Sequence, residues 1–406
     1  MANVSSSNGL EKRPRLAFRN TDGSHFPCWR QTSLGCIIEP YSEKVYGEHD
    51  YEVLTSAREG LQRQEDHFGS KQRHDTDGYN IIPFGYCTYR NRSDDGKFAF
   101  NINTISEKAI VSKFYPVFRF TNANSTFMAE FLNSSPRVKK KLSVLAVGTS
   151  QVVLSFEALK AAKFDLPCKD EQDKIAAFLE CLNARIENQR TLVVALKKYK
   201  RGVVRTLLSP KRCSIKNVKW TTSRIGDIGT FIKGAPLSKA DISLDGTPFI
   251  LYGELYTTYS EVISNVVRKT QASADKQYYS QIGDVIIPTS GETPEEISTA
   301  SCVMLPDIIL AGDLNIYRCT QVDGRIMSYI LNHVINDRIA RIAQGKSVVH
   351  VQAAEISKIE ITYPDPFSQK TIIAILAAIS DRIDQSNAEL RLLHELRKAL
   401  LQKLFI

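Results

Sequence analysis

The sequence predicts an α+β protein in which two similar α/β modules are each followed by one long helix, with the two helices forming an antiparallel coiled coil. The first observation is the stretch 172–209, which contains no Pro. Its apolar residues are spaced alternately by four and three positions, which is the heptad spacing of a long helix. The second is that residues 368–405 repeat this pattern, so that Ile175 recurs as Ile372 and Leu179 as Leu376. The chain therefore carries a pseudo-two-fold internal repeat.

The apolar seam of each helix is interrupted at the same two places. Gln189 and Lys200 stand in the first seam, and Ser386 and Arg397 stand at the corresponding positions of the second. Two unrelated amphipathic helices would not have polar residues at the same seam positions, so the two stretches are duplicates. Polar seam residues of this kind can fix the register of a helix pair. The apolar residues predicted to join the helices are Ile175, Leu179, Leu182, Ile186, Val193, Leu196, Ile372, Leu376, Ile379, Ile383, Leu390 and Leu393.

The duplication extends upstream of the helices at the same offset. Gly148-Thr149-Ser150 corresponds to Gly345-Lys346-Ser347, and Pro167 corresponds to Pro364. Two unrelated domains joined by helical linkers would not keep a constant offset through loop, proline and helix. We therefore expect a disordered lead at 1–14, a first module at 15–167, a spacer helix at 168–210, a second module at 211–364 and a second spacer helix at 365–406.

Composition narrows the class of protein. The net charge of +9, from 53 Lys and Arg against 44 Asp and Glu, favours a polyanionic partner. No run approaches the roughly 18 apolar residues of a membrane-spanning helix, and the first residues do not form a secretory signal. The eight cysteines are scattered without C-x-x-C spacing, which is typical of a cytoplasmic protein. Neither they nor the seven histidines have the spacing of a structural zinc site.

Each module reads as short strands arranged in small sheets. In the first module, strands are expected within 51–56, 79–89, 109–111 and 116–120 and a helix at 126–133; in the second, strands are expected at 248–252, 283–288, 315–318 and 359–363 and a helix at 326–342. The polar stretch 58–77 is expected to be a surface loop or a short helix. The basic run at 137–141 fits the solvated face of a helix.

A search for catalytic motifs finds none. Gly345-Lys346-Ser347 resembles the end of a phosphate-binding loop, but that motif requires a glycine where Ala340 stands and a strand where the sequence predicts a helix, so we expect a structural turn. The chain has no nucleophile elbow, no H-E-x-x-H and no glycine-rich dinucleotide fingerprint. It also lacks the Asn/Asp-Pro-Pro-aromatic tetrapeptide used in amino-group methylation. These observations predict a protein that is not an enzyme, with a stand-alone enzyme of unrecognised site as one alternative.

Geometry offers a function that needs no catalysis. A helix of this size is roughly 50 Å long at about 1.5 Å per residue. Half-sites on duplex DNA repeat every ~34–36 Å. Two basic modules held apart by such helices would read a two-part DNA target with an unread spacer. The alternative is a non-catalytic two-module coiled-coil scaffold that binds proteins.

From about position 15 onward the chain resembles the specificity subunit of a type I restriction–modification enzyme. The resemblance rests on residues 29–35 (WRQTSLG) followed by 54–60 (LTSAREG), on 110–118 (IVSKFYPVF) and on 283–293 (GDVIIPTSGET). It rests also on the duplicated pattern of proline, Glu/Ser-Gln and a long helix, which ends RGVVRTLL at 201–208 and KALLQKLF at 398–405. The second module matches the sequence motifs of this family more clearly than the first module does.

The resemblance implies that the modules are target recognition domains, each reading one half-site of double-stranded DNA. It implies that the two helices dock two modification (methyltransferase) subunits and, through them, the restriction subunits. The specificity subunit of this family has no catalysis and no cofactor of its own, whereas its partner subunits use S-adenosylmethionine, ATP and Mg²⁺.

Candidate DNA contacts are basic and polar residues beside the predicted strands. Arg and Lys can reach guanine edges or phosphates, and for any single one of these positions the alternative is an ordinary solvated charge, which is what most surface Arg and Lys residues are. In the first module the candidates are Arg58, Arg63, Lys71, Arg73, Arg90, Arg92 and Lys97, and in the second they are Lys233, Lys239, Thr289, Ser290, Lys346 and His350. No catalytic residue and no metal ligand is predicted.

Overall fold

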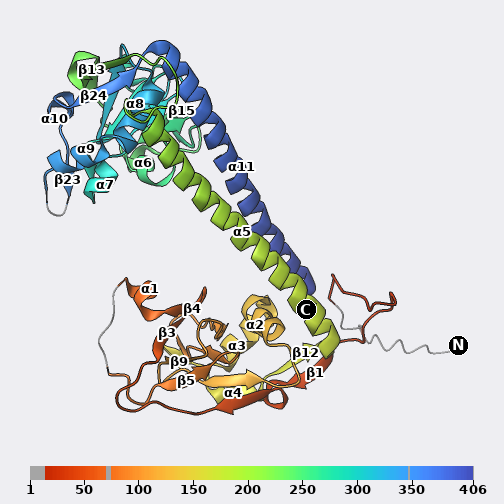
Figure 1. Ribbon diagram of the computed structural model, residues 1–406. Coiled ribbons are helices and arrows are strands. Elements are labelled where there is room, and N and C mark those ends of the chain that lie inside the picture. Colours follow the sequence, from red (N-terminus) through yellow and green to blue (C-terminus); the bar gives the residue numbers. More distant parts are fainter. Residues whose placement is uncertain (1–13, 70–74, 346–347, 406) are drawn as a thin grey trace. The chain divides into compact units, whose positions relative to one another are not determined.

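A computed structural model describes residues 14–69, 75–345 and 348–405 (Figure 1). The chain divides into two compact units. The first unit comprises Met1–Arg190 and Glu389–Ile406, and the second comprises Thr191–Ala388. Each unit therefore holds one globular module together with part of each long helix. In the described part of the chain, no helix combines the length and the apolar character needed to cross a lipid bilayer.

The two long helices are α5 (Lys169–Leu207) and α11 (Pro366–Leu404), each 39 residues long (Figure 1). Their starts follow known capping rules. Pro366 occupies the first position of α11, where its missing N–H costs nothing, and the Asp365 carboxylate accepts the backbone N–H groups of Phe367 and Ser368. The first turn of α5 carries Asp170 and Glu171, whose charge suits the positive end of the helix dipole.

The two helices pack against each other in antiparallel fashion within each unit. In the first unit, Ile175 and Leu179 of early α5 share one core with Leu401 and Leu404 of late α11. In the second unit, late α5 and early α11 meet in the same way, because Val204 joins a core with Ile372 and Leu376. Together with the mixed helix and sheet content of the modules, this arrangement confirms the predicted fold class.

The predicted seam residues all lie on the covered faces of the helices. Ile175, Leu179, Ile186, Val193, Ile372, Leu376 and Ile383 are buried, and Leu182, Leu196, Ile379, Leu390 and Leu393 are half-buried. Apolar helix faces of this kind gain free energy mainly by leaving water, at about 25 cal/mol per Å² of apolar surface.

In the described part of the first module, short strands form four small sheets. The sheet orders are β2-β10-β6-β8, β4-β3-β9-β5, β1-β12 and β11-β7. Its elements are β1 (Arg30–Ser33), β2 (Ile38–Tyr41), β3 (Glu52–Ala57), β4 (Gly60–Arg63), α1 (Gln64–Phe68), β5 (Asn80–Pro83), β6 (Cys87–Tyr89), β7 (Arg92–Ser93), β8 (Phe100–Ile102), β9 (Lys108–Val111), β10 (Val117–Phe120), α2 (Ser125–Ser134), α3 (Pro136–Leu145), β11 (Val152–Val153), α4 (Phe156–Ala161) and β12 (Lys163–Leu166), with the 3-10 turn η1 (Leu34–Cys36).

The second module has a related plan. Its sheet orders are β14-β22-β18-β20-β16, β17-β15-β21, β13-β24 and β19-β23. Its elements are β13 (Trp220–Arg224), β14 (Gly229–Lys233), β15 (Thr247–Leu251), α6 (Glu254–Thr257), β16 (Val262–Ile263), β17 (Arg268–Thr270), β18 (Asp284–Pro288), β19 (Ser290–Gly291), α7 (Pro294–Ile297), β20 (Ser301–Val303), β21 (Ile309–Ala311), β22 (Leu314–Cys319), α8 (Gly324–His333), α9 (Asn336–Ile342), β23 (Val349–His350), α10 (Ala353–Ser357) and β24 (Glu360–Pro364), with the 3-10 turns η2 (Ile225–Asp227), η3 (Lys239–Asp241) and η4 (Lys276–Tyr278).

The sequence repeat is reproduced hydrogen bond by hydrogen bond. Gln172 donates to the carbonyl of Pro167 and accepts the backbone N–H of Asn124, and Gln369 makes the same two bonds with Pro364 and Asp323. Asn124 and Asp323 are themselves the caps of α2 and α8. In both units one buried glutamine thus ties the long helix to the start of the module's principal helix.

A second pair of equivalent residues, Asn133 and Asn332, fixes a strand to that principal helix. The Asn133 amide pairs with both backbone groups of Phe100, and the Asn332 amide pairs with both backbone groups of Ala300. These correspondences relate α2 to α8 with a separation of 199 residues, the offset that also relates Asn124 to Asp323.

Two stretches differ from the sequence-based expectation. The helix expected at 326–342 is broken into α8 and α9, because the backbone N–H groups of Val334 and Ile335 both bond to the carbonyl of Ile330, and the Ile335 side chain turns into the core. Within 58–77, Gly60 with a φ of 137° turns the chain into a β3–β4 hairpin before the short α1. Residues 70–74 lie outside the described part.

The repeat leads to a stability prediction. Leu179 and Leu376 are equivalent, and both are fully buried, in separate cores. Replacing either by Ala should cost about 2–5 kcal/mol, the usual penalty for a buried Leu→Ala change. Hydrogen exchange should place the loss in the first module for Leu179→Ala and in the second for Leu376→Ala. Leu392→Ala, at a side chain that is 64% exposed, is the matched control and should change little. Loss of protection in the same module for both variants would contradict the assignment of the cores.

Candidate nucleic-acid interface

A groove of about 730 Å³ in the first unit brings together two of the predicted contact residues, Arg58 and Lys97. Its walls come from the β3–β4 hairpin, from β8, from α2 and from α11, whose Arg397 also lines it. Lys139, one of the exposed cations of the basic run on α3, is a further wall residue. The groove therefore gathers cations from four separate parts of the sequence.

One carboxylate organises the two predicted cations. Arg58 Nη2 lies 2.8 Å and Lys97 Nζ lies 3.2 Å from Asp95 Oδ2. The hydroxyl of Ser93 donates to the other oxygen, and this bond, with those from Lys97, holds the pKa of Asp95 well below its usual range. Both cations are about two-thirds exposed, and ion pairs of that kind are weak in water. They can therefore exchange Asp95 for a phosphate.

Arg63 lies on β4 and is held by another acid. Its Nε donates to Glu52 Oε1 at 2.9 Å, and the hydroxyl of Ser106 donates to the second carboxylate oxygen. The Ser106 bond first, and then Arg63, lower the pKa of Glu52. Arg63 does not line the groove that holds Arg58.

Arg92 and Arg90 are brought to the β9–β10 turn. The Arg92 guanidinium lies 5.0 Å and the Lys113 ammonium 5.8 Å from the centre of the Phe114 ring, which is 48% exposed. Burial raises the pKa of Tyr115, while the charge of the nearby Arg90 opposes that rise. An exposed aromatic ring flanked by cations is typical of surfaces that contact nucleic acid. In the sequence, residues 110–118 served only for the family resemblance, and neither Phe114 nor Lys113 was among the predicted contacts.

In the second unit a groove of about 1030 Å³ brings together Lys233, Thr289 and His350. It lies between the ends of β14 and β22 on one side and the β23–α10 segment on the other. Lys233 and His350 are exposed at its edge. Ser290 is buried next to it and pairs with His350 across the β19–β23 ladder, while its hydroxyl donates to Asp313.

Asn315 is a groove residue that sequence reasoning missed. It lies on β22 between Lys233 of β14 and Ile287 of β18, and its side chain is 2% exposed. Its Nδ2 group is buried and has no hydrogen-bond partner among the described residues. An unsatisfied buried donor is unfavourable, so an acceptor supplied from the groove would be stabilising there. Only the tertiary fold reveals this, because Asn315 reads as an ordinary strand residue.

Lys239 lies in a neighbouring depression of about 780 Å³, which shares Leu237, Ser238, Gly312 and Asp313 with the larger groove. It starts the short turn η3, which a capping box between Ser238 and Asp241 stabilises. The predicted candidates Lys71, Arg73 and Lys346 lie outside the described residues.

The glycine turn at Gly345 is a structural feature. Gly345 has a φ of 134°, and a β-carbon there would lie 1.9 Å from the carbonyl oxygen of Val348. Its repeat equivalent Gly148 has a φ of 144° and the same conflict, at 2.2 Å from Gln151. Both turns are closed by backbone bonds to a short strand, between Gln344 and His350 and between Val147 and Val153. The positive φ therefore accounts for the glycine at both positions, and no phosphate-binding role is needed to explain it.

Titratable groups outside the two grooves do not suggest a metal centre. In residues 14–69, 75–345 and 348–405, no group of three or more His, Cys, Asp and Glu side chains is placed to hold a metal ion. Cys36, Cys87, Cys168, Cys181, Cys213, Cys302 and Cys319 are free thiols. Burial raises the pKa of the Cys302 thiol to about 12, and it is therefore protonated and inert near neutral pH.

Comparison with known proteins finds one family. The family model described as the type I restriction modification DNA specificity domain matches residues 40–196 and again 217–394. The S subunit of a type I restriction–modification system from M. genitalium is similar in structure, with a TM-score of 0.58 and 16% identity over 97% of this chain and 99% of that chain. A second similar structure is described as the structural basis of complex assembly and conformational transition of the type I R-M system. It has a TM-score of 0.57 and 16% identity over 93% of this chain and 97% of that chain. No curated protein matches.

The Asp95 arrangement leads to a binding prediction. Asp95→Asn removes the charge that neutralises Arg58 and Lys97, so the variant should bind heparin more tightly and elute at higher salt than the parent. Glu157→Gln makes the same charge change at an exposed acid that pairs with Lys160 outside the groove, and it should shift elution less. Equal shifts for both variants would mean that the groove contributes only net charge.

Proposed function

The chain belongs to the type I restriction–modification DNA specificity family, and we propose that it reads a bipartite duplex target with one half-site per module. As a member of that family it is a DNA sequence-recognition subunit. The observation that carries the proposal is the double match, which falls once on each copy of the internal repeat. Each matched stretch contains most of one module and most of the long helix that follows it, which is the unit a half-site reader requires.

We propose a division of labour along the chain. Residues 15–167 and 211–364 are the two target recognition domains, and the helices within 168–210 and 365–406 are spacers. Each module offers a groove edged by exposed basic side chains, Arg58 and Lys97 in the first and Lys233 and His350 in the second. In this proposal the cations at the groove edges bind phosphates and set the position on DNA. Sequence is read by groups deeper in each groove.

In the second module we assign base reading to Asn315 and Thr289. An asparagine side chain forms two hydrogen bonds with the edge of adenine in the major groove, and Thr can contact several bases. Nδ2 of Asn315 is buried and unsatisfied, so in this proposal the amide turns toward the groove when DNA binds, and a base acceptor supplies its missing partner. In the first module, Arg92 and Phe114 at the β9–β10 turn form a second candidate contact.

The chain performs no reaction in this proposal. Members of the family act as non-catalytic subunits, and assembly with modification and restriction subunits would supply S-adenosylmethionine, ATP and Mg²⁺ chemistry. The docking of two modification subunits is proposed for the exposed faces of the long helices. Apolar side chains there support it: Val194 and Tyr199 on α5 and Leu392 and Leu396 on α11 are 48–64% exposed. A cytoplasmic location remains a prediction.

A mobility-shift assay separates this function from a protein-binding scaffold. A DNA reader should bind random duplex at low salt and lose most of that affinity as salt rises, because each phosphate contact releases counterions. A scaffold should not retard duplex DNA at either salt concentration, and that result would overturn the proposed function.

A module exchange tests the assignment of half-sites. Residues 213–364 are replaced by the matching module of a relative, and the hybrid is co-expressed with its modification subunits. Methylation-sensitive sequencing of host DNA should report one changed half-site, one retained half-site and an unchanged spacer, because bases are contacted by modules. A hybrid in which both half-sites changed would contradict the division of labour.

Single substitutions test the roles within the second groove. Lys233→Ala should weaken binding to all duplexes and lower the salt slope by about 1, as expected of one lost phosphate contact. Asn315→Ala should instead relax the preference at one base of one half-site by about 1–3 kcal/mol. Lys276→Ala removes an exposed cation that lines neither depression, and it should leave the base preference unchanged. A uniform loss of affinity for Asn315→Ala would contradict its reading role.

A further inference from the structure

Two basic residues interrupt the apolar faces of the long helices at equivalent places of the repeat, Lys200 in α5 and Arg397 in α11. Each of them reaches a carboxylate of the module in its own unit. Lys200 Nζ lies 2.8 Å from Glu261 Oε2 in the second unit, and Arg397 Nη2 lies 2.5 Å from Glu130 Oε1 in the first. These contacts connect helix to module, a role that heptad spacing alone did not predict.

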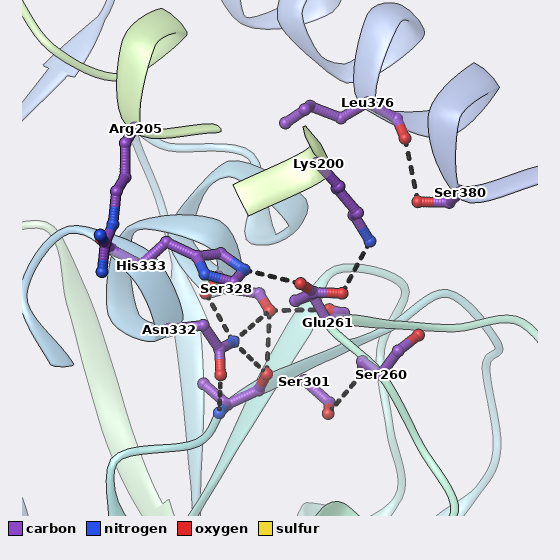
Figure 2. Close-up of polar contacts among 11 residues, drawn as sticks. Lys200, Arg205, Ser260, Glu261, Ser301, Ser328, Asn332, His333, Leu376 and Ser380 are labelled. Carbon is purple, nitrogen blue, oxygen red and sulfur yellow. Dashed lines mark hydrogen bonds and ion pairs between the residues drawn. The ribbon is translucent and has the colours of Figure 1, made fainter. Parts of the chain in front are cut away.

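The Lys200 pair lies in a buried polar cluster (Figure 2). Glu261 precedes β16 and accepts a second bond from His333 Nε2 at 2.6 Å, and the side chains of all three residues are only 10–15% exposed. The Tyr329 ring lies 5.3 Å from Lys200 Nζ. The hydroxyl of Ser328 donates to the Glu261 carbonyl and fixes the backbone there.

The Glu261 carboxylate is ionised under ordinary conditions. Burial opposes its charge, but the hydrogen bond from His333 and the charge of Lys200 outweigh burial and lower the pKa of Glu261 to about 2. Stability that depends on this carboxylate is therefore present above the ordinary pKa of a glutamate and is lost only as pH falls toward 2.

The Arg397 cluster uses the same place on the module. Arg397 Nε donates to Asn183 Oδ1 on α5, at 2.7 Å, while its second nitrogen holds Glu130 on α2. The 199-residue offset between α2 and α8 makes Tyr329 the equivalent of Glu130. In both units the basic helix residue thus contacts the same position of the principal helix, through an ion pair in one and an aromatic ring in the other.

A charged pair fixes the position of the module along the helix, which an apolar face alone does not. A module held only by apolar contacts could shift by seven residues along its helix and bury a similar set of side chains, since heptads repeat. Such a shift would place Val193 or Leu207 opposite Glu261 and leave a buried carboxylate without its partner, which is strongly unfavourable. The correctly formed pair adds little net stability, because desolvation offsets the attraction. Its main effect is to exclude the shifted packing.

We propose that Lys200–Glu261 and Arg397–Glu130 are positioning pairs that fix how each recognition module is seated on its helix, and through that seating fix the spacer length of the DNA target. This inference rests on the proposed function, because spacer length has meaning only for a bipartite reader. It goes beyond that function by naming residues whose role is to position the modules; Lys200 and Glu261 line neither depression of the second unit.

The test uses the full chain co-expressed with its modification subunits. Lys200→Met with Glu261→Gln removes both charges, keeps similar side-chain volumes and leaves an acceptor for His333. Methylation is mapped on targets whose spacer is the parental length or differs by one or two base pairs. The double variant should keep both half-sites but lose spacer preference by about tenfold, the change that 1.4 kcal/mol makes. Lys200→Arg, which retains the charge, should keep the parental spacer.

Controls separate this outcome from simple loss of folding. Lys197→Met changes an exposed lysine one turn away and should have no effect on spacer preference. If the Lys200 variant unfolds, Arg397→Met with Glu130→Gln asks the same question in the other unit. Because these two residues also line the first groove, only a changed spacer preference counts there, and a changed half-site does not. Folded variants that methylate only the parental spacer would overturn the positioning role while leaving the proposed function intact. A parent that methylates no bipartite target would overturn both.

Discussion

The structure depends on the apolar faces of the two long helices, neither of which can be buried by one repeat alone. Each half of α5 needs the opposite half of α11, so the first module is completed by residues from the end of the second repeat. Leu401, Leu404 and Phe405 lie in the same core as Trp29 and Phe118. Because apolar burial is non-directional, the fold also needs directional contacts, and Gln172, Gln369 and the two basic seam residues provide them in equivalent places.

Much of this architecture could be predicted because it is periodic. Heptad spacing identifies a long helix from local sequence, and an offset that holds through Pro167 and Pro364 identifies a duplication. The break between α8 and α9 could not be predicted, since it depends on Ile335 finding a place in the core. The surroundings of Lys200 were equally invisible, because Glu261 and His333 reach it from distant parts of the sequence.

The candidate interface depends even more on contacts between distant parts of the sequence, which local sequence patterns do not predict. Choosing exposed Arg and Lys beside strands located Arg58 and Lys97 in one groove and Lys233 and His350 in another, but it did not reveal that Asp95 holds the first pair. Nor could it find Asn315, whose importance comes from a missing partner. Surface cations are defined by composition, whereas the groups that discriminate between bases are defined by geometry. The modest net charge of +9 implies that recognition relies on these local arrangements.

The contact between Phe405 and the first module has a consequence for biosynthesis. The Phe405 ring lies 5.8 Å from that of Phe127 and 5.6 Å from that of Phe131, in the core of a module that is translated before the second module. That core stays open until residue 405 has emerged from the exit tunnel, whereas a domain with only local contacts closes during translation. The nascent chain must therefore carry an unfinished apolar surface through the synthesis of the entire second module. A stop codon that removed Leu401, Leu404 and Phe405 would therefore damage the first module, although that module lies more than 200 residues upstream.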